Sequence, residues 1–245
     1  MILKLTVQAD ILWEGNKPLT YFQFNLSRVY DHQIPENELE QSKVIWDTEK
    51  QKFPQIYDGN LVYIDKMTIN SSIEFNAGIM KYSSLVYLAR TNQSFKGRRG
   101  YLSFKIILYY KKGTVPRYLV GLKSSQSQFG PDNWTMPGGM VETKAEDIVD
   151  LSYSAKQEII EETGIKDIKN QISCHLLTKG SRNLGICMIL SLEIDPKVLG
   201  SIRENEEFEP SSFHWLQGKE ILQLSDETIY NDVAALKYLI RNNKI

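Results

Sequence analysis

The arrangement of apolar and polar residues along the chain predicts a mixture of short strands and amphipathic helices. β-Branched and aromatic residues cluster in short runs, whereas other stretches repeat apolar residues at the three- or four-residue spacing of a helix. Residues 101–110 and 118–122 are two strand-like runs, and the turn at 111–113 between them predicts a hairpin. The other expected elements are strands at 20–26, 61–64 and 185–192 and helices at 36–50, 145–163 and 229–240.

This order of elements predicts an α/β fold in which helices cover a mixed β-sheet. The pattern is clearer in the later part of the chain, so we expect residues 81–245 to form the main domain and residues 1–80 a smaller α+β lobe that recognises substrate. Taken as single aromatic residues, Trp46 and Tyr57 are expected in the packed interior of that lobe. The helix at 145–163 is expected to pack through an apolar stripe made of Ile148, Leu151, Ala155 and Ile159.

The charge balance of the chain favours a small-molecule ligand over a polymer or a membrane. The 29 lysines and arginines and the 30 aspartates and glutamates leave a formal net charge of −1, which supplies no overall field for nucleic acid or lipid. No apolar run approaches the roughly 20 residues of a membrane span, and polar residues interrupt the first residues too soon for a signal peptide. We expect a cytoplasmic protein with no nucleic-acid or membrane partner, and the sequence leaves its oligomeric state open.

Cysteine and histidine are too scarce to supply a metal centre. Cys174 and Cys187 are too few for a disulfide framework or a four-cysteine zinc site, and we expect both as buried thiols. The three histidines are scattered along the chain. If the chain binds a metal ion, carboxylate side chains are therefore the remaining ligands.

Three glutamates share one face of the predicted helix at 145–163. Glu158 and Glu162 are four residues apart and Glu158 and Glu161 three, so their side chains project to neighbouring positions. Like charges so close together repel each other. A hard cation such as Mg²⁺ offsets them with oxygen ligands and keeps open positions for substrate phosphates. The spacing therefore indicates a divalent-cation site suited to cutting diphosphates.

Glycines stand on both sides of this acidic run. Gly138 and Gly139 follow Pro137 at the end of a short strand-like stretch, where a glycine turn lets the backbone approach a ligand closely. Gly164 follows the glutamates directly, where a helix ends in a left-handed residue.

These residues resemble the signature of the Nudix hydrolases, G-x5-E-x7-R-E-U-x-E-E-x-G-U, in which U is aliphatic. The stretch at 157–165, QEIIEETGI, matches its second half except at Gln157, where the family has an arginine that orients the glutamates. In the first half, 18 residues separate Gly139 from Glu158, against 14 in the family pattern. Glu142 and Glu146 are the two candidates for the upstream family glutamate. Downstream, the acidic loop and tryptophan-containing stretch at 208–216 also resemble the family.

The resemblance implies a Nudix-like α/β/α sandwich with a mixed sheet and a site for Mg²⁺, with Mn²⁺ as an alternative. Glu158, Glu161 and Glu162 would be the catalytic carboxylates and metal ligands, together with the carbonyl of Gly138. The general base would be one of these glutamates or an acid of the later loop. Glu207 and Glu209 are the candidates there for a base or an additional ligand.

Phosphate recognition calls for cations besides the metal, and the planar fork of arginine binds two phosphate oxygens at once. Arg98 and Arg99, just before the strand at 101–110, are the first candidates, and Arg28 is another. Gly139 is expected to bring its backbone close to the substrate.

The N-terminal half carries a second resemblance, to the UDP-glucose pyrophosphatase-like branch of the family, through residues 44–48, 54, 57–59 and 75–78. It implies Mg²⁺-dependent cleavage of a nucleoside diphosphate linked to another group, namely a UDP-sugar such as UDP-glucose, to UMP and sugar 1-phosphate. An ADP-ribose, NADH or coenzyme A pyrophosphatase is the alternative within enzymes. A Nudix-like sensor that binds a nucleotide without cutting it is the alternative from another class.

Overall fold

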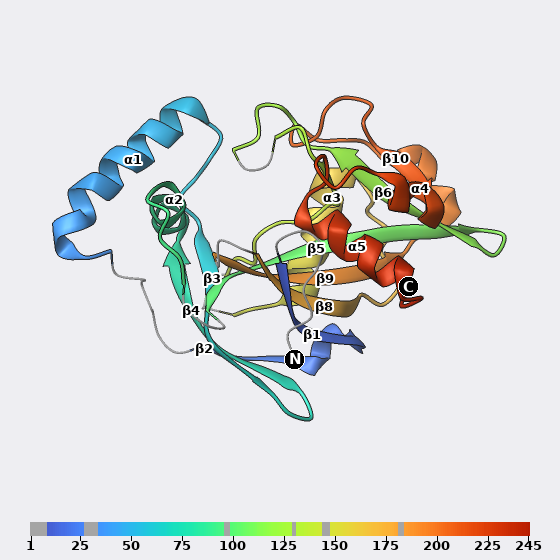
Figure 1. The fold of residues 1–245 in the computed structure, drawn as a ribbon, viewed down its shortest axis with the longest axis horizontal. Helices are drawn as coiled ribbons and strands as arrows, with labels where there is room; N and C mark the ends of the chain where they lie inside the picture. The colour runs from blue at the N-terminus through green and yellow to red at the C-terminus, as the bar shows by residue number, and fades with distance from the viewer. Residues whose placement is uncertain (1–8, 27–33, 96–98, 129–130, 144–147, 181–183) are drawn as a thin grey trace.

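The computed structural model describes residues 9–26, 34–95, 99–128, 131–143, 148–180 and 184–245. Among these residues, ten strands join into one mixed β-sheet with helices around it (Figure 1). The strands are β1 (Ala9–Pro18), β2 (Phe22–Leu26), β3 (Asn60–Ile69), β4 (Ile73–Lys81), β5 (Gly100–Lys112), β6 (Val115–Leu122), β7 (Trp134–Thr135), β8 (Ser173–Gly180), β9 (Gly185–Glu193) and β10 (His214–Gln217). The helices are α1 (Leu39–Lys52), α2 (Tyr82–Arg90), α3 (Leu151–Thr163), α4 (Gly218–Gln223) and α5 (Asn231–Arg241), with short 3₁₀ turns η1 (Leu19–Tyr21), η2 (Glu36–Glu38) and η3 (Pro196–Ser201).

The main path of the sheet runs β1-β8-β9-β5-β3-β4-β2. β5 pairs with β9 in parallel, and β2 with β4 in parallel, whereas β1 with β8, β8 with β9, β3 with β4 and β3 with β5 pair antiparallel. The far end of β5 turns back into β6 through the predicted hairpin, with Tyr109 opposite Tyr118. β7 and β10 then pair with β6.

Helices cover both faces of the sheet, as an α/β/α sandwich requires. Because side chains of a strand alternate between its two faces, β5 shows which helix lies on which side. Phe104 and Ile106 of β5 share a core with Ala155 and Ile159 of α3. Ile107, on the opposite face, belongs to a second core with the apolar side of α5, which crosses the sheet in Figure 1.

Helix α3 begins at Leu151, later than the sequence pattern predicts. Asp150 has an extended backbone and its carboxylate accepts a hydrogen bond from Tyr153 N at 2.9 Å, so it caps the helix N-terminus. Ile148 lies before this cap and is 54% exposed, so its expected place in the packed stripe was wrong. The helix ends as predicted: Gly164 has φ 72° and its N–H donates to Ile160 O at 2.9 Å.

The N-terminal residues carry the two helices on the left of Figure 1 and strands of the common sheet. Helix α1 is joined to α2 by Glu49, a buried residue whose carboxylate accepts from Arg90 Nε at 2.9 Å and Nη2 at 2.7 Å. β3 pairs with β5 through Tyr63 and Tyr101, so the sheet continues across the expected boundary at residue 80. A division into two domains stays a prediction.

Three other expectations concern individual residues and segments. Tyr57 is 62% exposed, so its expected place in the lobe interior was wrong. Cys174 is buried and Cys187 half-buried, and both are free thiols. Within the described ranges, no helix combines the length and the hydrophobicity that a membrane crossing requires.

Candidate active site

The glycine turn lies directly against β5. Residues 137–141 run beside the strand as an irregular partner: Phe104 N donates to Gly139 O at 2.9 Å and Ile106 N to Pro137 O at 2.8 Å. Gly138, between them, has φ 142°, a conformation that side-chain-bearing residues rarely adopt. A Cβ on Gly138 would collide with the carbonyl oxygen of Phe104 and lie 2.8 Å from Cα of Lys105. Glycine at this position is therefore what allows the turn to approach the strand.

Glu162, at the end of α3, is bonded to this turn. Its Oε2 accepts a hydrogen bond from Gly138 N at 2.5 Å, and the residue is 3% exposed. Burial raises the pKa of Glu162 to about 8; Lys105 and the Gly138 N–H oppose the rise, while the Glu158 and Glu207 carboxylates add to it. The turn thus holds a carboxylate whose charge is only partly compensated.

Glu158 lies one turn earlier on α3, against Gly139. A Cβ on Gly139 would be 2.6 Å from the carboxyl carbon of Glu158, so this glycine makes room for the acid. Burial raises the pKa of Glu158 to about 7, and the Glu161 and Glu207 carboxylates raise it further, while Lys105 lowers it. Glu161 is exposed on the helix surface and acts on Glu158 through its charge.

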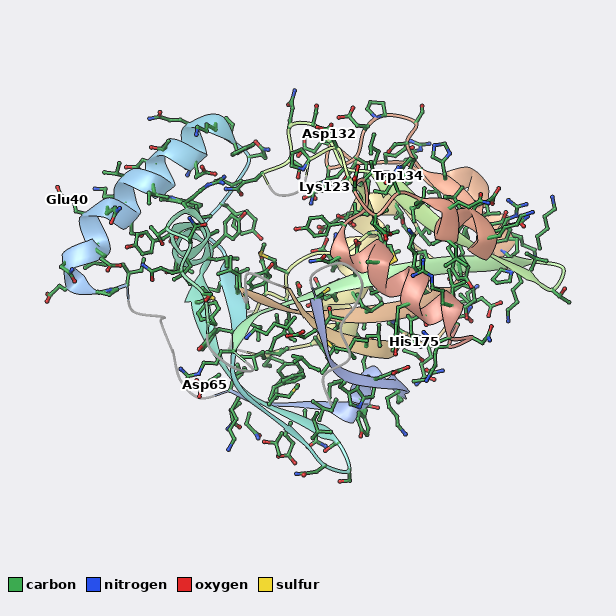
Figure 2. All side chains as sticks on the ribbon, viewed as in Figure 1. Glu40, Asp65, Lys123, Asp132, Trp134 and His175 are labelled. Atoms are coloured by element: carbon green, nitrogen blue, oxygen red, sulfur yellow. The ribbon has the colours of Figure 1, made fainter. Side chains whose placement is uncertain are left out.

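Of the two acids predicted in the later loop, Glu207 faces the helix glutamates. Its charge contributes to the raised pKa of both Glu158 and Glu162. Its carboxylate is 3.5 Å from Lys123 Nζ, and Figure 2 shows Lys123 beside Trp134, where β6 meets β7. Glu209 is engaged elsewhere, because its Oε1 accepts from Ser125 N at 2.6 Å.

Sequence reasoning missed two charged residues beneath the turn, the half-buried Lys105 and the buried Asp232. Lys105 Nζ donates to Met136 O and to Gly138 O, both at 3.1 Å. Asp232, in the first turn of α5 and 3% exposed, accepts from Met136 N at 2.7 Å and from Thr135 Oγ1 at 2.8 Å. The available signal was a charged residue next to apolar ones: Lys105 lies between Phe104 and Ile106, and Asp232 precedes Val233.

An aromatic residue and a further acid form the rim of the site nearest the N-terminal helices. Tyr57 Oη donates to Glu142 Oε1 at 2.5 Å. Burial and this bond raise the pKa of Tyr57 above its ordinary value, and the Glu158 and Glu161 charges add to the rise. Of the two candidates for the upstream glutamate, Glu142 therefore adjoins the site, and Glu146 lies outside the described residues.

The predicted phosphate-binding arginines are not gathered at these carboxylates by any described contact. Arg99 forms an ion pair with Asp65 at 3.0 Å, and Asp65 lies well apart from Lys123 in Figure 2. Arg28 and Arg98 lie outside the described residues.

The carboxylates are neighbours without forming a finished metal site. Over the part of the chain that the structure describes, no group of three or more histidine, cysteine, aspartate or glutamate side chains is arranged to hold a metal ion. The chemistry of the donors nevertheless fits a hard cation. Glu158, Glu162 and Glu207 supply carboxylate oxygens, and their mutual repulsion is what a divalent charge would relieve.

No protein-family model matches the chain, and no curated protein matches it. Several solved structures resemble part of it. The MutT protein from Methanosarcina mazei Go1 is 19% identical over 59% of this chain and 95% of its own, with a TM-score of 0.44. The Nudix domain of Shewanella oneidensis NrtR, in complex with ADP ribose, is 15% identical over 62% of this chain and 91% of its own, with a TM-score of 0.45.

A C. elegans Ap4A hydrolase, in a binary complex, is 16% identical over 58% of this chain and 95% of its own, with a TM-score of 0.39. Identities and TM-scores this low do not decide the family or the activity. The function proposed below rests on the residues of this chain.

Gly138→Ala is expected to lower the free energy of unfolding by about 1–3 kcal/mol, because the new Cβ meets the Phe104 carbonyl and the backbone is strained. Gly113→Ala is the matched control: it also has positive φ, but no atom lies within 4 Å of its Cβ position. Urea denaturation of both variants measures the difference. Equal losses would show that crowding against β5 is unimportant.

The metal-free protein is expected to lose stability as pH rises from about 5 to about 8. The folded state keeps protons on Glu158 and Glu162 that the unfolded chain has already released, so unfolding releases protons across this window. Melting temperatures in a chelating buffer measure the slope, which should be shallower in Glu162→Gln. The same slope in wild type and variant would contradict the assignment.

Proposed function

We propose that the protein is a Mg²⁺-dependent pyrophosphohydrolase that cleaves the diphosphate linkage of a nucleoside diphosphate joined to another group. One observation carries the proposal: Glu158 and Glu162 of α3 lie against the glycine turn at Gly138 and Gly139, and burial together with the charge of Glu207 from the later loop raises the pKa of both. A purely structural role gives little reason to collect like charges that are only partly compensated in a partly buried place. A site that binds a cation gives such a reason, because the cation neutralises these charges.

The residues proposed to hold the cation are Glu158, Glu161 and Glu162, with the Gly138 carbonyl as a backbone ligand. When bound, Mg²⁺, or Mn²⁺ in its place, supplies charge neutralisation for the diphosphate oxygens and activation of water. Because these side chains are not yet arranged around one point, cation and substrate would draw the exposed Glu161 and half-buried Glu158 into place.

Glu207 is the better candidate for a general base or an additional ligand. Its carboxylate is exposed and close enough to the helix glutamates to change their pKa values, whereas Glu209 is bonded to Ser125 N. Lys123, 3.5 Å from Glu207, is well placed to hold this acid or to meet a phosphate oxygen.

A UDP-sugar such as UDP-glucose is the proposed substrate, cleaved to UMP and sugar 1-phosphate. The weaker sequence resemblance of the N-terminal half supports it, and so does the rim formed by Tyr57 and Glu142. An exposed aromatic ring beside a carboxylate suits a sugar, whose C–H face packs on the ring while its hydroxyls donate to the acid. ADP-ribose, NADH and coenzyme A are the competing substrates.

A nucleotide sensor without catalysis is the second candidate function. The observation that favours it is that the described carboxylates form no ready-made metal site. Sensor and enzyme share the binding of a nucleotide and differ in turnover.

The first test is a panel of UDP-glucose, ADP-ribose, NADH and coenzyme A with Mg²⁺ or Mn²⁺, scored by chromatography of the products. We expect release of UMP and glucose 1-phosphate from UDP-glucose, with the highest kcat/KM of the panel. Calorimetry on the same compounds separates the alternatives, since binding without product indicates the sensor. Absence of both turnover and binding across the panel would refute both functions.

Glu158→Gln and Glu162→Gln are each expected to lower kcat by about 100-fold or more while circular dichroism stays unchanged. Glutamine keeps the size of the side chain and a carbonyl acceptor for Gly138 N, but it removes the charge that a cation needs. Glu40→Gln is the control, because Glu40 is exposed on α1, away from the site in Figure 2. Near-normal rates in both site variants would show that the metal site lies elsewhere.

A further inference from the structure

The turn beneath the candidate site is bonded to charged side chains in a specific order. Met136 and Gly138 each give their N–H to a buried carboxylate, Met136 to Asp232 at 2.7 Å and Gly138 to Glu162 at 2.5 Å. Both carbonyls accept from one ammonium, that of Lys105, at 3.1 Å each. One lysine and two acids from three elements, β5, α3 and α5, therefore hold the same two residues.

Lys105, Asp232 and Glu162 depend on one another for charge compensation, unlike independent residues on the surface. Asp232 and Glu162 are both 3% exposed, and a buried carboxylate is costly unless a positive charge or hydrogen bonds compensate it. Burial by itself would lower the pKa of Lys105, but the Asp232 and Glu162 carboxylates outweigh it and hold the pKa above its ordinary value. Lys105 thus places a positive charge at a turn whose N–H groups are held by two buried acids.

The second lysine in this region has a different partner. Lys123 lies 3.5 Å from the Glu207 carboxylate, whereas Lys105 is bonded to the turn. Burial lowers the pKa of Lys123 and the like charge of Lys105 lowers it further. The two lysines therefore differ in their direct contacts: Lys123 pairs with Glu207 of the loop, and Lys105 is bonded to the carbonyls of the turn.

We propose that Lys105 is a positioning residue and a built-in counter-cation of the carboxylate site, fixing the Gly138 turn and neutralising Asp232 and Glu162 before any metal arrives. It supplies from β5 a permanent positive charge on the inner side of the turn. An incoming cation would then meet a site in which part of the Glu162 charge is already balanced, while Glu158 and Glu161 depend on the cation. The role goes beyond the proposed function, since the charge balance exists whether or not a substrate is cut.

The test is a double-variant cycle on unfolding, in chelating buffer at pH 8. Lys105→Met is expected to lower the melting temperature by on the order of 5 °C or more. Adding Glu162→Gln to it should recover part of that loss, because it removes an acid that Lys105 neutralised. Mg²⁺ should raise the melting temperature of Lys105→Met more than that of wild type, because the metal replaces the missing charge.

Lys237→Met is the matched control. Lys237 is 3% exposed and, like Lys105, donates to a backbone carbonyl, that of Leu224, but it pairs with Asp226 away from the turn. We expect it to be destabilising, additive with Glu162→Gln and unchanged in its response to Mg²⁺. Lys105→Arg, which keeps the charge, should respond to Mg²⁺ as wild type does.

Additive losses for Lys105→Met and Glu162→Gln, with a wild-type response to Mg²⁺, would overturn the proposal and leave Lys105 as a hydrogen-bond donor only. If Lys105→Met does not fold, a cooperative transition regained in the double variant is the expected result, and its absence counts against the proposal. No substrate enters these measurements. The outcome is therefore separate from the search for hydrolase activity.

Discussion

The whole site depends on the charged contacts that hold residues 136–138 against β5. The carboxylates of Asp232 and Glu162 accept hydrogen bonds from the N–H groups of this short segment, and the ammonium of Lys105 donates to its carbonyls. Each of the three side chains comes from an element anchored in a different part of the fold. A shift of α3, α5 or β5 would break at least one of these contacts. The geometry of the site therefore depends on the packing of the complete sandwich.

Local sequence information was enough for the elements themselves. The hairpin of β5 and β6, helix α5 and the end of α3 follow from turn residues and apolar spacing within a few positions of each other. The position of Glu158 and Glu162 on one helical face could also be predicted from local sequence, since it depends only on helix geometry. The early part of the predicted helix failed because Asp150, a capping residue, outweighs the apolar spacing that includes Ile148.

Residues brought together from distant parts of the chain could not be found in this way. Lys105, Gly138 and Asp232 meet only after β5, the glycine turn and α5 have packed, and no spacing rule connects them. Gly138 was predicted from the glycine turn, whereas Lys105 and Asp232 were visible only as charged residues next to apolar ones, a signal that does not name a partner. The same holds for Tyr57, whose ring is exposed and whose hydroxyl bonds to Glu142, 85 positions later in the sequence.

The order of strands in the sheet has a consequence for how the chain matures. β1 pairs with β8, so this strand finds its neighbour only after Ser173–Gly180 has been synthesised. Until then its edge stays unpaired, and such edges invite association with other chains. The β1–β8 pairing therefore joins segments that lie far apart in the sequence, and contacts of this kind favour slow folding.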